Sequence, residues 1–437
     1  MYSRSIYWFK RDLRIDDNRA FYNACISSLE LIPVFVFIPQ LIEKFKAYDQ
    51  RVGFIVDCIS KLTYDIRNIG GELYCFYEDP ENVFERIIDK YKPQALFTSK
   101  SFSWTGEEIE TKVEKICIRK GVKFHSITDS FLSRIQEIPY KKVFTPFFKE
   151  WYRRLDLDIS EIPKNVVVPK LEEDNIYSLL RKIKYLPNDF WKIDYLWYRM
   201  RNFDFANYDK TRNSLDIDGS SKLSPYIRFG VISLRKIYNT VCKELGEESQ
   251  FVKELAWREF WYHIKFNFPE FNNFEFQEGR RNINWENRDE FIEAFFEART
   301  GYPIVDAAII QLKTEKWLHN RARMIVANFL TKDLLVDWRI GERFFMEHLI
   351  DYDEVVNVGN WQWNASVGPD PKPLRIFNPI IQAQKFDPFA NYIKKYLPEL
   401  KNIPYNYLHD PLSFDLPYHK PIVNHFERVK LVKRLYS

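Results

Sequence analysis

The run LIPVFVFI at residues 31–38 decides the fold class of this 437-residue chain. It is apolar throughout and rich in Val, Ile and Phe, which is typical of a strand covered on both faces. Similar runs stand at residues 5–9, 72–77, 95–99 and 123–127, separated by stretches long enough for crossover helices. We therefore predict a parallel, doubly wound α/β sheet of five strands, with ligands expected at the carboxyl ends of its strands.

The part of the chain after residue 128 follows a different pattern. Residues 129–195 carry scattered prolines and charges without a clear period, which indicates an extended connector. Beyond them the periodicity is almost entirely helical, for example at residues 250–266, 303–314 and 318–332. The sequence thus predicts an α/β domain at 1–128, a linker at 129–195 and an all-helical domain at 196–437.

The composition excludes several classes of protein. Apolar residues make up 46% and charged residues 29%, as in soluble globular proteins, and no apolar stretch is long enough to span a membrane. The 13 glycines form neither a G-x-G-x-x-G nor a Walker A motif, which excludes a glycine-cradled nucleotide site. Five cysteines without a C-x-x-C pair argue against a disulfide framework or a zinc site. Because no signal peptide is visible either, we expect a cytoplasmic protein.

One predicted helix carries a carboxylate, a guanidinium and two indoles on a single face. Glu254, Trp257, Arg258 and Trp261 follow the spacing i, i+3, i+4, i+7. A carboxylate within an aromatic face would be a strong acceptor for the N–H or imide group of a ligand. The alternative is a core stripe in which Glu254 simply pairs with Arg258.

A second helix presents Asn320 and Met324 at i, i+4, flanked by Arg321 and Arg323. Such a face usually just packs, so this pair is a weaker candidate for a site. The segment 219–224, GSSKLS, offers hydroxyls, backbone N–H groups and a cation, which suit a diphosphate, although Ser-rich turns also cap helices.

The segment from Asp351 to Trp363 places several polar groups and two indoles within 13 residues. Its Asp351-x-Asp353 pair has no His or Cys nearby, so we expect no metal. Tryptophans suit electron transfer because an oxidised indole is delocalised, but any single one is more often a core residue. The net charge of +4 is too small to indicate a nucleic-acid partner by itself.

Six longer stretches carry a family resemblance. The start WFKRDLRIDDNRAF at residues 8–21 resembles the first strand and turn of the photolyase and cryptochrome family. Five later stretches resemble the flavin domain of that family in order and spacing. They are YDKTRNSLDIDGSSKLSPYIRFG at 208–230, ELAWREFWYH at 254–263, TGYPIVDAAIIQL at 300–312, KWLHNRARMIVANFLTKDLLVDWRIGERFF at 316–345 and DYDEVVNVGNWQWNAS at 351–366.

The resemblance implies a U-shaped FAD in the helical domain, reduced in its active form. Asp351 would pair with Arg323 beside the isoalloxazine, Asp353 would meet the flavin's polar edge or the adenosine side, and Asn357 would face N5. A neutral amide at N5 can bond to N–H as well as to bare N. The residues implied around the phosphates and the ribityl chain are Tyr208, Ser220, Ser221, Lys222, Leu223 and Ser224, assisted by Arg258.

The substrate pocket resembles that of DNA photolyases acting on cyclobutane pyrimidine dimers, so UV-damaged DNA is the expected partner. Glu254 would hydrogen-bond the dimer, and Asn320 and Met324 would contact the dimer or the flavin. Trp257 and Trp363 would form an apolar wedge against the flipped-out lesion, while Arg212 and Arg321 would bind phosphates. The resemblance further implies a photoreduction relay that runs from the flavin to the surface through Trp361, Trp338 and Trp285.

The antenna region departs from the family pattern. Residues 103–107, SWTGE, lack the Asn-Glu pair by which folate-binding members hold their antenna, so folate is not expected. A deazaflavin, FMN or second FAD near Phe35, Phe37 and Arg51 is left open, as is the absence of an antenna.

Two other functions would use the same flavin as repair of cyclobutane dimers. A cryptochrome-type signalling photoreceptor is disfavoured because the lesion-pocket residues are intact and the chain stops soon after Arg428. Repair of the six-four photoproduct would need a histidine near position 320, and His319 is out of register. We expect a monomer without an obligate protein partner and without a membrane partner.

Overall fold

The computed structural model describes all residues except 43–47, 165, 182–184, 247, 248, 371, 373 and 437. The chain forms two compact units. The α/β unit contains residues 1–138, 151–203 and 222–247, and the helical unit contains residues 139–150, 204–221 and 248–437. The unit boundary therefore falls within helix α6 (Phe144–Arg153), which lies in the stretch that the sequence predicts as an extended connector.

The sheet of the α/β unit is the parallel, doubly wound sheet that the sequence predicts. Its strands are β1 (Tyr2–Phe9), β2 (Ser28–Phe37), β3 (Tyr74–Tyr77), β4 (Ala95–Ser99) and β5 (Lys123–Ile127). They pair in the order β3-β2-β1-β4-β5, and all neighbours are parallel. The order reverses between β1 and β4, where doubly wound folds open a crevice at the carboxyl ends.

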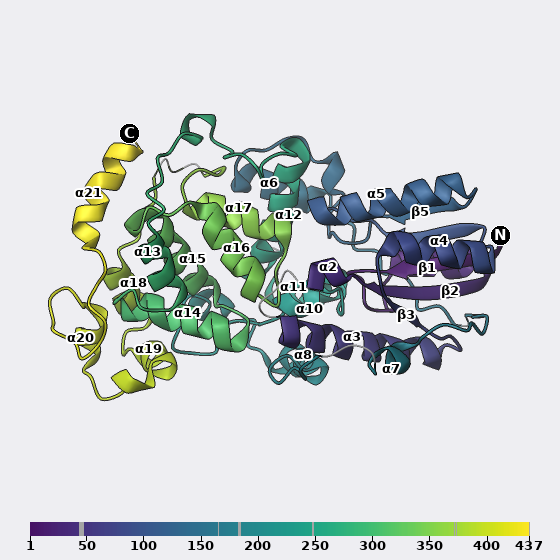
Figure 1. Cartoon of the computed structure of the whole chain (residues 1–437), viewed down its shortest axis with the longest axis horizontal. Helices are drawn as coiled ribbons and strands as arrows, with labels where there is room; N and C mark the ends of the chain where they lie inside the picture. Colours follow the sequence, from purple (N-terminus) through teal and green to yellow (C-terminus); the bar gives the residue numbers. More distant parts are fainter. Residues whose placement is uncertain are drawn as a thin grey trace. The chain divides into compact units, whose positions relative to one another are not determined.

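Helices cover both faces of this sheet. Figure 1 shows α4 (Pro80–Tyr91) and α5 (Trp104–Arg119) on one side and α3 (Tyr48–Asn68) on the other. Helix α4 begins where Asp79 accepts a hydrogen bond from the backbone N–H of Glu81, with Pro80 at the first helical position. The other helices of this unit are α1 (Arg19–Ser27), α2 (Pro39–Ile42), α7 (Ile176–Leu179), α8 (Ile193–Asn202), α10 (Ser224–Arg228) and α11 (Leu234–Leu245).

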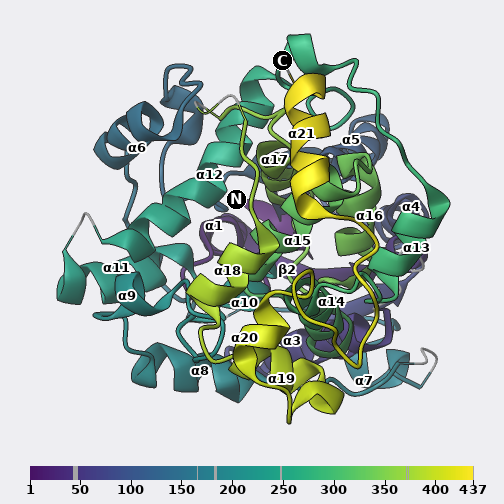
Figure 2. The same ribbon diagram turned by 90° about the vertical axis from the view of Figure 1, so that its left-hand side faces the viewer.

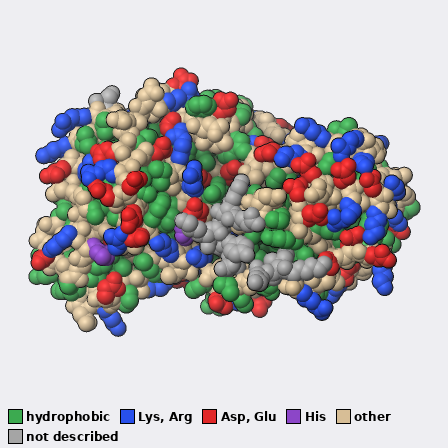
Figure 3. Space-filling model, viewed as in Figure 1, with side chains coloured by type: hydrophobic (Ala, Val, Ile, Leu, Met, Phe, Trp, Pro, Cys, Tyr) green, Lys and Arg blue, Asp and Glu red, His purple; other side chains and the backbone are tan. Residues whose placement is uncertain are grey.

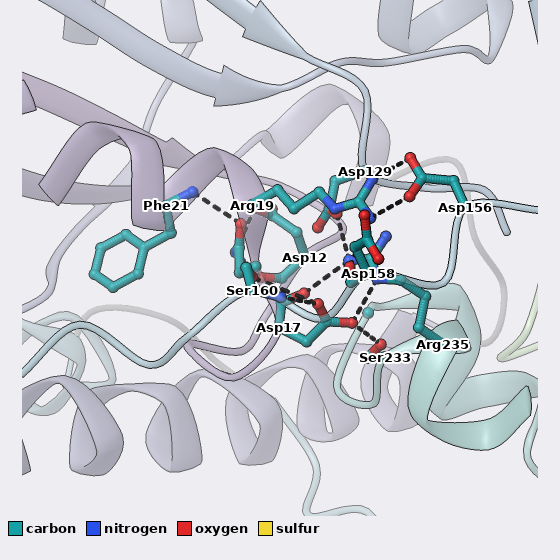
Figure 4. A network of polar contacts seen from close by, with 12 residues as sticks. Asp12, Asp17, Arg19, Phe21, Asp129, Asp156, Asp158, Ser160, Ser233 and Arg235 are labelled. Atoms are coloured by element: carbon teal, nitrogen blue, oxygen red, sulfur yellow. Dashed lines mark hydrogen bonds and ion pairs between the residues drawn. The ribbon is translucent and has the colours of Figure 1, made fainter. Parts of the chain in front are cut away.

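A buried ion network ties α11 to the loop after β1 (Figure 4). Arg235 donates from Nε to Oδ2 of Asp17 at 2.7 Å and from Nη2 to Oδ1 of Asp129 at 2.6 Å. Arg14 donates to the other oxygen of Asp129 at 2.9 Å. These contacts explain why residues 222–247, which the sequence assigns to the helical domain, pack with the α/β unit.

The described part of the helical unit contains no strand, and its helices are joined by turns and irregular segments (Figure 2). One helix that the sequence predicts at 318–332 is in fact α15 followed by a π-helical turn at Phe329–Asp333. The helices are α9 (Tyr208–Thr211), α12 (Gln250–Asn267), α13 (Asp289–Phe296), α14 (Pro303–Glu315), α15 (Asn320–Asn328), α16 (Trp338–His348), α17 (Glu354–Asn364), α18 (Pro379–Phe386), α19 (Asn391–Tyr396), α20 (Tyr405–His409) and α21 (His425–Leu435).

Two glycines let tryptophans lie directly against helix backbones. A Cβ at Gly341 of α16 would stand 2.2 Å from Cη2 of Trp361, and a Cβ at Gly359 of α17 would stand 2.3 Å from Cε3 of Trp261. Neither approach is compatible with a larger residue. Helices α12, α16 and α17 therefore meet through indole rings.

In the part of the chain that the structure covers, no helix combines the length and apolarity needed to cross a membrane. The same residues contain no group of three His, Cys, Asp or Glu side chains that could hold a metal ion.

Candidate active site

An ion pair connects α15 to the segment before α17. Arg323 donates from Nη2 to Oδ2 of Asp351 at 2.8 Å and to Oδ1 at 3.0 Å, and its Nε donates to the carbonyl of Leu318 at 2.8 Å. The Asp351 side chain is almost fully buried, so its charge is compensated by a fixed guanidinium. The two side chains pair as the resemblance implies.

Asn357 on α17 is oriented by a carboxylate that the sequence analysis missed. Its amide nitrogen donates to Oε1 of Glu342 at 2.9 Å, and Tyr352 donates to the same oxygen at 3.0 Å. The same nitrogen donates to the backbone carbonyl of Glu342 at 3.2 Å, and a carbonyl can only accept, so the amide turns its nitrogen toward Glu342 and leaves its carbonyl oxygen for a ligand. Burial raises the pKa of Glu342.

Asp353 begins α17 and faces α12. It accepts a hydrogen bond from the hydroxyl of Tyr262 at 2.8 Å and one from the backbone N–H of Val356 at 3.2 Å. The guanidinium of Arg258 lies 5.3 Å from the centre of the Tyr262 ring. Arg258 and Asp353 thus share Tyr262 as a common neighbour, which the spacing of the motifs did not reveal.

Glu254 has a partner that local spacing could not indicate. Its carboxylate forms an ion pair with Arg212 and accepts from Nε2 of Gln250 at 2.9 Å. Both members of the ion pair are only partly exposed. This contact spans 42 positions in the sequence, so the i, i+4 spacing with Arg258 gives no sign of it. Burial raises the pKa of the neighbouring Tyr208.

Trp257 is stacked on one side by an aromatic residue from the predicted connector. The rings of Trp257 and Phe144 are parallel within 3° and their centres are 3.8 Å apart. Phe260 meets the indole edge-on at 5.4 Å, and Trp261 lies tilted at 5.8 Å. Phe144 carried no signal in the sequence, because only the tertiary fold brings α6 to α12.

The remaining pocket residues are spread over α15 and α17. Asn320 is exposed at the start of α15, and Met324 is half-buried. Arg321 donates to Oδ1 of Asn213 at 2.7 Å, and burial lowers its pKa. Trp363 is half-buried, with the guanidinium of Arg375 lying 4.2 Å from its ring centre.

The GSSKLS segment runs directly into α10, whose first residue is Ser224. Lys222 has a positive φ of 54°, and Leu223 is buried. Ser220 and Ser221 belong to the helical unit, whereas Lys222, Leu223 and Ser224 pack with the α/β unit. Their contact with a diphosphate stays a prediction.

Of the three relay tryptophans, the two placed nearer the flavin are buried and the outermost is partly exposed. Trp361 and Trp338 are each 1% exposed, and Trp285 is half-buried. The Trp361 ring lies against Gly341, one helical turn from Trp338 on α16. Next to Trp285, the backbone N–H of Glu286 donates to the carbonyl of Leu335 at 2.8 Å, and Leu335 lies just before α16.

Comparison with known proteins identifies this arrangement. Residues 5–167 match the family model for DNA photolyase, and residues 251–437 match the model for the FAD binding domain of DNA photolyase. A deoxyribodipyrimidine photo-lyase from Synechococcus sp. is 34% identical, over 99% of this chain and 96% of its own length. The chain belongs to the photolyase and cryptochrome family.

Solved structures of this family share the fold. The crystal structure of an archaeal photolyase from Sulfolobus tokodaii with two FAD molecules has a TM-score of 0.90 and 33% identity, covering 99% of each chain. A cryptochrome from Synechocystis sp. has a TM-score of 0.87 at 24% identity, covering 100% of this chain and 99% of its own, which shows the common fold alone. The predicted family and FAD as the cofactor are confirmed.

The side chains of the helical unit fit a flavin. Asp351 and Arg323 supply a paired acceptor and donor, and Asn357 presents its carbonyl oxygen. The indole N–H of Trp361 is buried without an acceptor in the described part of the chain, as expected beside a large ligand. Bound FAD would supply the light-absorbing redox group, and these residues would hold its polar edge.

Proposed function

We propose that this chain is a deoxyribodipyrimidine photo-lyase that splits cyclobutane pyrimidine dimers in DNA under light. Reduced FAD would supply a photoexcited electron donor, the chemistry needed to open the cyclobutane ring without hydrolysis. The observation that supports the dimer as substrate is the α12 face, where a polar Glu254 cluster lies beside the stacked Trp257. Such a site can accept a base's N–H and stack on its ring at the same time.

Different side chains would contact different parts of the lesion. Trp257 and Trp363 form the apolar wedge, with Phe144 and Arg375 supporting one side of each ring. Asn320 and Met324 complete the pocket from α15. Glu254 accepts from the pyrimidine base edge once Arg212 turns to a phosphate, and Arg321 contacts a further phosphate.

The charge distribution of the surface fits a DNA partner that is held through few phosphate contacts. Figure 3 shows Lys and Arg side chains interleaved with Asp and Glu over the face it presents, in keeping with the small net charge of +4. We propose that affinity for damaged DNA comes from the flipped lesion plus a small number of phosphates. The enzyme would act as a monomer in the cytoplasm, associated with the nucleoid if its source is a prokaryote.

A second chromophore would sit in the α/β unit. Phe35 and Phe37 lie edge-to-face at 4.9 Å at the carboxyl end of β2, and Arg51 of α3 is buried. The relative from Sulfolobus tokodaii with two FAD molecules supports a flavin in this role over folate.

Light-dependent repair is the direct test. The reduced protein, mixed with an oligonucleotide that contains a thymine dimer, should remove the dimer under blue light and leave it intact in the dark. Contacts by Arg212 and Arg321 should give a slope of about −2 in the logarithm of affinity against the logarithm of salt concentration. Photoreduction of bound FAD without loss of dimer would instead indicate a cryptochrome-type photoreceptor.

Trp285→Phe should block photoreduction of oxidised FAD and leave repair by chemically reduced enzyme nearly unchanged. Phe fills similar space, but its ring is much harder to oxidise, so the last step to the surface fails. The measurement is the rate of flavin bleaching under blue light with an external thiol. Trp317→Phe is the control, because Trp317 is a buried indole outside the relay. Equal bleaching in Trp285→Phe and wild type would show that electrons leave by another route.

A further inference from the structure

The indole N–H of Trp338 has a carboxylate partner. Nε1 of Trp338 donates to Oε1 of Glu275 at 3.2 Å. Both residues are buried, at 1% and 4% exposure. Glu275 lies in the segment between α12 and α13, and neither the sequence motifs nor the family resemblance singled it out. Burying a carboxylate costs free energy, so packing alone does not account for a carboxylate at this indole N–H.

The neighbouring indole is treated differently. Trp361 is as buried as Trp338, but its Nε1–H has no acceptor among the described residues. Exposure therefore does not distinguish the two rings, whereas hydrogen bonding does. Oxidation makes an indole positively charged and its N–H strongly acidic, so an adjacent carboxylate stabilises the oxidised ring.

We propose that Glu275 is the hydrogen-bond and proton acceptor of Trp338, so that this indole loses its Nε1 proton when it is oxidised during photoreduction. The inference rests on the relay of the proposed function. With FAD bound, Trp361 would be the electron donor to the photoexcited oxidised flavin, and Trp338 would then give one electron to Trp361 and restore it. The Nε1 proton of oxidised Trp338 passes to Oε1 of Glu275, leaving a neutral indole radical and a carboxylic acid. An electron relayed through Trp285 from an external thiol, together with return of this proton, restores both groups.

A nearby cation opposes this effect and is itself neutralised. The guanidinium of Arg339 lies 4.6 Å from the Trp338 ring centre and would disfavour an oxidised indole. Arg339 forms ion pairs with Glu275 at 2.8 Å and with Asp337 at 3.3 Å. One cation and two carboxylates together carry one negative charge. The cation is therefore offset, and the direct bond from Glu275 to the indole decides the balance.

Asp337 provides a matched control for charge. It pairs with the same guanidinium but caps α16 through the backbone N–H of Arg339 at 2.9 Å, and it makes no contact with the Trp338 indole N–H. Asn caps helices as well as Asp does, so Asp337→Asn removes one negative charge and keeps the helix start. Glu275→Gln removes the same charge and, in addition, the proton acceptor.

The experiment is transient absorption of the FAD-loaded protein after a light pulse. Glu275→Gln should lower the yield of the long-lived tryptophan radical by about tenfold or more and abolish the solvent deuterium effect on deprotonation of the oxidised indole. Asp337→Asn should change the yield by less than about twofold, the scale of a partly exposed ion pair. Equal effects of the two variants would overturn the proposal.

A flavin-free readout keeps this inference separate from the proposed function. In apoprotein labelled with ¹⁵N-tryptophan, the indole N–H resonance missing from Trp338→Phe belongs to Trp338. It should shift in Glu275→Gln and stay in place in Asp337→Asn. If Trp338→Phe removes the tryptophan radical seen in the wild type but Glu275→Gln leaves it intact, the role of Glu275 is wrong and the relay stands. A wild-type protein without any tryptophan radical overturns the relay and this inference together.

Discussion

Asp17→Asn is expected to lower the free energy of unfolding by about 3–5 kcal/mol, the usual effect of breaking a buried ion pair by changing one partner. Asp17 and Arg235 have side-chain exposures of 0% and 2%. Oδ1 of Asp17 accepts from the backbone N–H of Ser160 at 2.9 Å, while Oδ2 accepts from Arg235 and Ser233 (Figure 4). An amide would turn its own donor toward one of these donors, so one contact becomes repulsive.

Asn also keeps the backbone conformation, which makes the test specific for the charge. Asp17 has a φ of 48°, and Asn is well tolerated in this left-handed region. The neighbouring Asp16 provides the control, because it pairs with Lys236 at the surface. Asp16→Asn should cost less than about 1 kcal/mol in equilibrium urea unfolding. Equal losses for the two variants would show that burial of the network contributes nothing.

The effect of Asp17→Asn should shrink in acid. Burial opposes ionisation of Asp17, but the hydrogen bonds from Arg235 and Ser233 outweigh it and lower the pKa of this carboxyl. A lowered native pKa stabilises the fold above the unfolded value of about 3.9 and loses that stabilisation as the pH falls through the native pKa. Urea unfolding at neutral pH and at pH values below about 4 measures this difference.

Gly341→Ala is expected to destabilise the helical unit by about 1–3 kcal/mol and to slow flavin photoreduction. The new Cβ would stand 2.2 Å from Cη2 of Trp361 and 2.5 Å from Cδ2 of Leu330. The rigid indole must move away from α16, which lengthens the path to Trp338. In an open helix the same change stabilises by about 1 kcal/mol, so the sign of the effect reports the contact.

Gly279→Ala is the matched control for this change. A Cβ at Gly279 would meet no heavy atom within 4 Å, so unfolding and photoreduction should stay near their wild-type values. The two measurements are the urea midpoint and the rate of flavin bleaching under blue light. Wild-type values of both in Gly341→Ala would show that the Trp361 ring does not depend on this contact.

Several features of the site were predictable because their signals are local or recur in the family. The pairing of Arg323 with Asp351 and the increase in exposure from Trp361 to Trp285 agree with what the motifs imply. Residues that act through contacts distant in sequence were missed. Glu342, which orients Asn357, and Phe144, which stacks on Trp257, stand in stretches where spacing carries no information about their partners.

By itself, the sequence determined the five-strand sheet, the helical second half and the family, because apolar periodicity is set residue by residue and the motifs are contiguous. Only the tertiary structure decided that Glu254 pairs with Arg212 and that α11 joins the α/β unit through Arg235. The same holds for the carboxylate that meets the indole of Trp338. The physical reason is that a buried charge or N–H must find a partner in space, and a linear pattern does not record which distant segment supplies it.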